Sequence, residues 1–224
     1  MRRRKLDGVL LDVDGTLIDS NAAHAESWSD TLAEFGRPTP PEKVRPLIGM
    51  GGDKLLPQLL GVEADSADGK KFSERRAEIF REHYVPKLRL TRGAKQFVER
   101  LRREGFRIII ATSAKEEELE AMLQQVGLDD LIPHRTSADD AEESKPDPDI
   151  VQAALRKAKL HPDAAIMLGD TPYDVEAARR AGIDCVAVLT GGWNSEALKE
   201  AVAIYDDPDD ILRHFTASPF AAGA

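Results

Sequence analysis

The sequence predicts an α/β fold, in which a parallel sheet is covered by helices on both faces and carries an inserted α-helical domain. Two observations predict it. Short apolar runs rich in isoleucine and valine alternate with helical patterns along most of the chain, which is typical of a parallel sheet. In addition, the long stretch after the first run contains helical patterns and no convincing strand.

Five apolar runs have the length of buried strands, and they cover residues 9–13, 106–111, 131–136, 164–168 and 184–189. Helices are predicted between the later runs at residues 94–104, 116–126, 148–159 and 174–181. Gly105, Gly127 and Gly182 stand where three of these helices would end. A short helix at 208–214 is predicted to close the fold, followed by a frayed Ala/Gly-rich tail from Ala217.

The stretch between the first two strands is predicted to be a separate helical domain. Its helical segments cover residues 22–35, 53–60 and 70–84. About seventy residues is far more than a crossover helix needs, so an insertion explains the stretch best. We therefore expect a catalytic core of residues 1–18 and 90–224 and a helical cap of residues 19–89, which hangs over the end of the first strand.

Composition excludes several classes of protein. The chain has 224 residues, 42% of them hydrophobic and 32% charged, which is typical of an ordinary globular protein. A net charge of −9 argues against binding to nucleic acid or to anionic membranes. The basic start, residues 2–5, lacks the apolar segment of a signal peptide, and no apolar stretch approaches the roughly eighteen residues that span a bilayer. Cys185 is the only cysteine, so a reducing cytoplasm is the expected location.

The most informative local feature is a pair of aspartates at the exit of the first strand. Asp12 and Asp14 are two residues apart, and alternate residues of a strand share a face, so both carboxylates can enter one pocket. Gly15 permits a sharp turn there. Two close carboxylates repel each other unless a cation lies between them or one is protonated. A hard, oxygen-binding ion such as Mg²⁺ resolves that conflict.

Polar residues also follow the next three strands, where ligands of such sheets bind. Thr112 and Ser113 follow the second strand, just before a helix whose first N–H groups can face an anion. Lys145 lies in the loop after the third strand, and Asp170 and Asp174 follow the fourth. Each residue alone can be explained as a helix cap or a solvated loop charge. The four strand ends together favour a site for a phosphate and a divalent cation.

These motifs resemble the haloacid dehalogenase superfamily, in its branch with a small helical cap, which includes phosphoglycolate phosphatases and β-phosphoglucomutases. Residues 12–16 match the first motif, Thr112 the second, Lys145 the third and residues 169–174 the fourth. The resemblance covers nearly the whole chain. It implies a Rossmann-like core, a mobile cap, Mg²⁺ as the cofactor and an aspartyl-phosphate intermediate.

The resemblance also implies a role for each acidic residue. Asp12 is expected to be the nucleophile, and Asp14 the general acid and then the general base. Mg²⁺ is expected to bind Asp12, the backbone carbonyl of Asp14 and Asp170, with Asp174 as a direct or water-mediated ligand. Thr16 is expected to orient Asp14.

Thr112 and Lys145 are expected to bind the transferring phosphoryl oxygens, while Lys145 neutralises the charge that grows on them. Ser113 is a further candidate for this phosphate site, at a position where many relatives carry asparagine. Asp14 favours phosphate-ester chemistry, because the dehalogenases and phosphonoacetaldehyde hydrolases of the superfamily lack a second aspartate at this position.

The cap is expected to contact the leaving group. Gly51 and Gly52 allow close backbone approach, and Lys54 can meet an anionic or hydroxylated substrate. Gly51, Gly52 and Asp53 can also be explained as a simple helix start. His24, near the cap hinge, resembles a histidine of sugar-phosphate mutases and many phosphatases, and a solvated histidine is the other explanation.

The leading hypothesis is a Mg²⁺-dependent phosphatase that acts on a small phosphorylated metabolite, such as phosphoglycolate or a sugar phosphate. Phosphoryl transfer of the β-phosphoglucomutase type uses the same core residues and is the alternative. A non-catalytic ligand-binding relative is a third hypothesis, against which the intact Asp12, Asp14, Lys145 and Asp170 count. The oligomeric state stays open, with a monomer favoured.

Overall fold

The described residues, 5–223 of a computed structural model, contain a single parallel sheet with strand order β3-β2-β1-β4-β5-β6. The order reverses at β1, between β2 and β4, and such a switch opens a crevice beyond the carboxyl ends of the strands. Its strands are β1 (Gly8–Leu11), β2 (Arg107–Ala111), β3 (Arg135–Thr136), β4 (Ala165–Gly169), β5 (Asp184–Val188) and β6 (Ala203–Tyr205).

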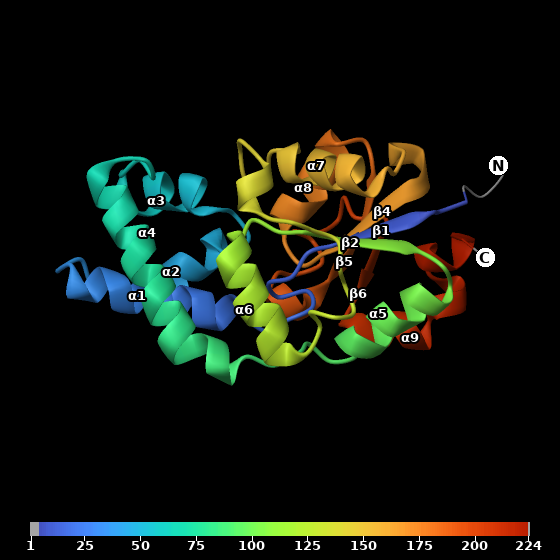
Figure 1. The fold of residues 1–224 in the computed structure, drawn as a ribbon, viewed down its shortest axis with the longest axis horizontal. Helices are drawn as coiled ribbons and strands as arrows, with labels where there is room; N and C mark the ends of the chain where they lie inside the picture. The colour runs from blue at the N-terminus through green and yellow to red at the C-terminus, as the bar shows by residue number, and fades with distance from the viewer. Residues whose placement is uncertain (1–4, 224) are drawn as a thin grey trace.

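Helices cover both faces of this sheet, as predicted (Figure 1). Alternate strand residues face opposite sides, so Val9 and Leu11 join one apolar cluster while Leu10 joins the other. The first face is covered by α5 (Ala94–Arg103), α6 (Glu116–Val126) and α9 (Pro208–Arg213), and the second by α7 (Asp149–Ala158) and α8 (Pro172–Arg180).

Residues 19–89, here called the helical insert, belong to the connection between β1 and β2. They contain helices and no strand of the sheet, and they lie to the left in Figure 1. Its helices pack around their own apolar cluster, which includes Trp28, Leu32 and Phe72. They are α1 (Asn21–Glu34), α2 (Pro41–Val44), α3 (Gly52–Leu60) and α4 (Ala67–Ile79), and a π-helical turn, Phe80–Tyr84, continues α4. The single turn α2 was not predicted from the sequence.

Two strands differ from the prediction. The expected third strand, 131–136, is limited to Arg135–Thr136. The N–H groups of Leu131 and Ile132 instead donate to the Leu128 carbonyl in the turn that follows α6, and Pro133 has no N–H to offer a strand. The edge strand β6 was not predicted, because it comprises only three half-buried residues.

The prediction of a frayed tail from Ala217 is wrong for the described part of the chain. Short 3-10 turns occupy Phe215–Ala217 and Pro219–Gly223. Phe220 is only 1% exposed and packs edge-to-face against Phe97 of α5, with ring centroids 5.1 Å apart. The tail therefore contributes an aromatic side chain to the core.

Part of the basic start of the chain, residues 2–4, lies outside the described residues. Among residues 5–223, the helices are all too short or too polar to cross a membrane.

We expect Phe220→Ala to lower the free energy of unfolding by about 3 kcal/mol, because truncation of a buried phenylalanine leaves a cavity against Phe97. Urea denaturation measures the effect. Val202→Ala is the control, since Val202 is 51% exposed and its truncation should change stability by less than about 0.5 kcal/mol. Equal effects of the two substitutions would contradict a packed tail.

Candidate active site

Three buried aspartates meet at the carboxyl ends of β1 and β4. Asp12 follows β1 directly, and its N–H donates to the Leu168 carbonyl at 2.9 Å, which continues the pairing of the two strands. Asp170 and Asp174 follow β4, and all three side chains are at most 5% exposed. One carboxylate oxygen of each lies within 4.8 Å of the others. The structure therefore brings together three residues that were predicted from the sequence to share a site.

Lys145 joins the same cluster from the loop between β3 and α7. Its side chain is fully buried, and its Nζ donates to Asp12 Oδ1 at 2.5 Å and to Asp174 Oδ1 at 2.7 Å. Its carboxylate partners raise the pKa of Lys145 above its usual value although burial opposes this, so the ammonium stays charged.

The charges of this cluster do not balance. Burial raises the pKa of Asp12 to about 7, although Lys145 opposes the shift. Burial and the charges of Asp12 and Asp174 likewise raise the pKa of Asp170 well above its usual value. Three carboxylates and one ammonium leave two negative charges in excess when all are ionised. A hard divalent cation with oxygen ligands fits this cluster.

The Asp170 carboxylate accepts hydrogen bonds from the turn after β1 and from the first residue of α1. Thr16 Oγ1 donates to its Oδ1 at 3.1 Å, and Asn21 Nδ2 donates to its Oδ2 at 2.8 Å. Gly15, at φ +74°, lies so close that a Cβ there would meet Asp170 Oδ2 at 2.2 Å. Thr16 therefore contacts Asp170 rather than Asp14, which differs from the sequence prediction, and Asn21 was not predicted at all.

Asp174 lies in the first turn of α8 and forms a capping box with Thr171, which precedes the helix. Thr171 Oγ1 donates to Asp174 Oδ2 at 2.6 Å, and the Asp174 N–H donates back to Thr171 Oγ1 at 3.2 Å. Because Lys145 contacts the other oxygen, both carboxylate oxygens of Asp174 already have partners. Because of this capping box, the helix begins at Pro172, two residues before the predicted start.

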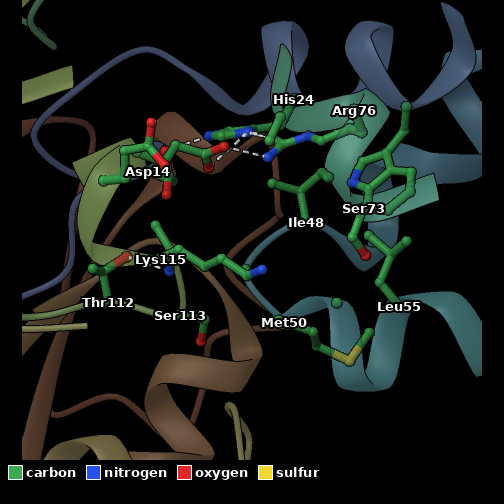
Figure 2. A pocket seen from close by; sticks show the side chains of 18 of the residues that line it. Asp14, His24, Ile48, Met50, Leu55, Ser73, Arg76, Thr112, Ser113 and Lys115 are labelled. Carbon is green, nitrogen blue, oxygen red and sulfur yellow. Dashed lines mark hydrogen bonds and ion pairs between the residues drawn. The ribbon is translucent and has the colours of Figure 1, made fainter. Parts of the chain in front are cut away.

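Asp14 is not one of these three clustered aspartates and is held by the helical insert, where it faces His24 (Figure 2). Ser20 Oγ donates to its Oδ1 at 2.5 Å, and His24 Nε2 lies 2.6 Å from the same oxygen. Burial alone would raise the pKa of Asp14, but the interaction with His24 and the hydrogen bond from Ser20 lower it below its usual value. Asp14 is therefore ionised in this arrangement.

Arg76 of α4 connects this group to the core, as the dashed lines in Figure 2 mark. Its guanidinium contacts His24 Nδ1, and it pairs with Glu118 of α6 at 2.5 Å. Because arginine can only donate, Nδ1 accepts, and the histidine proton is left on Nε2, facing Asp14. The guanidinium and the His24 ring both stack on Phe80, at 4.5 and 4.2 Å. Sequence reasoning missed Arg76.

A pocket of about 350 Å³ lies between the core and the helical insert. The core contributes side chains at the ends of β1 and β2, and the insert contributes His24 and the start of α3. The predicted residues that line it are Asp12, Asp14, His24, Gly51, Gly52, Thr112 and Ser113. The Ser113 hydroxyl is buried and has no hydrogen-bond partner among the described residues.

Lys115, at the start of α6, also lines this pocket and was not predicted. Figure 2 shows its side chain extending across the pocket toward Ile48 and Met50. Within residues 5–223 no carboxylate lies within ion-pair distance of its ammonium group, which makes it an available cation for a ligand.

Lys54 does not line this pocket. Its Nζ lies 2.7 Å from Glu143 Oε2 and 2.8 Å from Asp147 Oδ2, both in the loop that carries Lys145. The structure therefore places this predicted substrate contact against the core.

The chain and its fold are also similar to those of known proteins. The sequence model of a family described as "Haloacid dehalogenase-like hydrolase" matches residues 9–188. Phosphoglycolate phosphatase of Rhodospirillum rubrum is 31% identical over 210 residues, which cover 89% of this chain and 86% of that protein. The crystal structure of a hydrolase from Pseudomonas syringae has 29% identity and a TM-score of 0.87, covering 95% of this chain and 98% of that one. The β-phosphoglucomutase of Clostridium difficile shares the fold, with 18% identity and a TM-score of 0.82 over 96% and 97% of the two chains.

Proposed function

The chain belongs to the haloacid dehalogenase-like hydrolase family and is a phosphoric monoester hydrolase, and from this premise we propose a Mg²⁺-dependent phosphatase of small phosphorylated metabolites. Phosphoglycolate is the first candidate substrate, since relatives at about this level of identity carry that name. One observation carries the proposal. The buried group of Asp12, Lys145, Asp170 and Asp174 adjoins a pocket that Asp14 also lines.

Asp12 is the proposed nucleophile. Attack of its carboxylate on phosphorus forms an acyl phosphate and releases the alcohol, and water then hydrolyses that acyl phosphate to return the carboxylate. Lys145 contacts Asp12 and supplies a positive charge beside the phosphoryl group, where negative charge grows. Thr112 and the unpartnered Ser113 hydroxyl are the proposed contacts of the other phosphoryl oxygens.

Mg²⁺ is the proposed cofactor, with Asp12, Asp170 and the Asp14 backbone carbonyl as its ligands. When bound, it neutralises the excess negative charge of the cluster and of the phosphate. The two oxygens of Asp174 already accept hydrogen bonds from Lys145 and Thr171, which favours a water-mediated role for this residue.

Asp14 is the proposed general acid and base. Its ionised state, held by His24 and Ser20, is the form that can take a proton from the attacking water in the second step. Arg76 fixes the His24 tautomer that donates to Asp14, so the insert prepares this carboxylate.

The pocket also supports a choice of substrate class. Lys115 brings to the pocket a cation that has no ion-pair partner among residues 5–223, which suits a substrate with a second anionic group, such as a carboxylate. We further propose that residues 19–89 act as a cap over the core of residues 1–18 and 90–224. A cytoplasmic location is proposed from the single buried cysteine, Cys185.

Transfer of a phosphoryl group between sugar positions is the second candidate, since the fold is shared with a β-phosphoglucomutase. It requires the same nucleophile and the same acid. Formation of glucose 6-phosphate from β-glucose 1-phosphate, faster than release of free phosphate, would favour it.

The experiment is a phosphate-release assay on a panel of phosphoglycolate, sugar phosphates and β-glucose 1-phosphate, ranked by kcat/KM. We expect activity with Mg²⁺ and a loss of roughly 100-fold or more with EDTA, because the excess negative charge is then uncompensated. Restored activity on addition of Mg²⁺ is the control for irreversible damage. Full activity in EDTA, or no phosphate release from any compound, would overturn the proposal.

A further inference from the structure

We propose that Lys54 is a positioning residue, which ties the helical insert to the 142–147 loop and thereby holds Lys145 between Asp12 and Asp174. The inference rests on the proposed function, because it concerns the group that binds the phosphoryl oxygens. It also assigns Lys54 a role other than the substrate contact expected from sequence.

The contact comprises several interactions between the start of α3 and one loop. Lys54 Nζ meets Glu143 and Asp147, at 2.7 and 2.8 Å. On either side of this ion pair, the Gly51 N–H donates to Ser144 Oγ at 3.0 Å, and the Ser144 N–H donates to Asp53 Oδ2 at 3.1 Å. The partners on the loop, residues 143, 144 and 147, bracket Lys145 in the sequence.

The position of Lys145 depends on this loop. Its Nζ lies between two buried carboxylates, whereas its backbone belongs to an irregular connection between β3 and α7. Arg180 of α8 holds the second Asp147 oxygen at 3.0 Å from the core side. Lys54 therefore supplies the matching restraint from the side of the insert.

The charge of Lys54 persists in this environment. Burial would lower the pKa of Lys54, but hydrogen bonds to Asp147 and Glu143 raise it above its usual value. The Lys54 side chain is 19% exposed and the Glu143 side chain 59% exposed, so salt will screen the pair. A sensitivity to ionic strength follows, which a neutral packing contact would not have.

The test is Lys54→Gln, with Lys43→Gln as the matched control. Lys43 lies in α2 of the same insert, is exposed, and makes no ion pair within the described part of the chain. We expect Lys54→Gln to lower kcat about 5- to 10-fold, by a similar factor for every substrate of the panel and with little change in KM. Wild-type kcat should fall with added NaCl toward the value of the variant, whose own kcat should change little.

Rescue by charge exchange sharpens the test. Lys54→Glu combined with Glu143→Lys should recover part of the kcat that Lys54→Glu alone loses, because the ion pair is restored with reversed polarity. A kcat of Lys54→Gln equal to that of Lys43→Gln would overturn the inference. A rise in KM for one substrate with unchanged kcat would also overturn it, and would show a substrate contact instead.

Hydrogen–deuterium exchange separates this inference from the proposed function. Faster exchange of residues 142–147 in Lys54→Gln than in wild type and Lys43→Gln supports the restraint, whatever the enzyme hydrolyses. Unchanged exchange would refute it, even if the phosphatase assay succeeds.

Discussion

Asp12→Asn is expected to lower kcat by roughly 10⁴-fold or more, because the amide keeps the shape of the side chain but has no anionic oxygen to attack phosphorus. Initial rates of phosphate release, measured on the best substrate of the panel, check the value. Asp184→Asn is the matched control, since Asp184 is exposed and is the first residue of β5, at the opposite end of the strands from the cluster.

Asp12→Asn is expected to leave the free energy of unfolding unchanged or slightly higher. Burial and the neighbouring carboxylates raise the pKa of Asp12 to about 7, so the ionised form is disfavoured in the folded protein. Removal of its charge relieves that cost while Lys145 keeps Asp174 as a partner. Loss of both activity and stability would show a folding defect, and retention of activity would refute the role of Asp12.

Lys145→Met is expected to lower kcat by roughly 10³-fold and, without Mg²⁺, to lower the free energy of unfolding by about 3 kcal/mol. The substitution preserves an unbranched side chain but leaves the buried Asp12 and Asp174 without the ammonium group that pairs with them. Urea denaturation with and without Mg²⁺ measures the stability, and added Mg²⁺ should restore part of it. Lys157→Met is the control, because Lys157 pairs with Asp140 at 3.5 Å on the surface.

The pH dependence of the Lys145→Met effect identifies its cause. The carboxyl groups of the cluster have pKa values raised by burial and by one another. The folded protein then binds protons that the unfolded chain releases, so stability falls as pH rises through the folded pKa. The loss should therefore be larger at pH 8 than at pH 6 in the absence of metal. An equal loss at both values would point to packing instead.

The sequence predicted the sheet and the aspartate cluster because both depend on short-range patterns. Strand ends of a parallel sheet meet at one edge, so Asp12 and Asp170 could be placed together without coordinates. The same rule placed Lys145, although its loop has no regular structure. Strand β6 and the packed Phe220 escaped prediction, because a three-residue strand and a short aromatic turn carry no periodicity.

The contacts between the insert and the core could not be predicted in this way. Arg75 and Arg76 are neighbours of the same type on α4, yet Arg75 pairs with Glu34 in solvent while Arg76 reaches His24 and Glu118. Nothing local distinguishes them, because their roles depend on which face of the helix meets the core. Lys54 shows the same limit, since its partners lie about ninety positions away in the chain.

The core and the helical insert contribute different residues to the site, and this affects how such an enzyme can evolve. The core supplies all of the proposed hydrolytic group, which consists of Asp12, Lys145, Asp170 and Asp174. The insert contacts this group through Asn21 at the start of α1 and holds the Lys145 loop through the start of α3. The insert could be replaced after His24 by that of a relative, provided that the new segment also carries residues that make the contacts of Arg76 and Lys54. We expect such a replacement to direct the enzyme to another phosphate ester. Substrate selectivity could then change through replacement of the insert, while the buried group of the core stays the same.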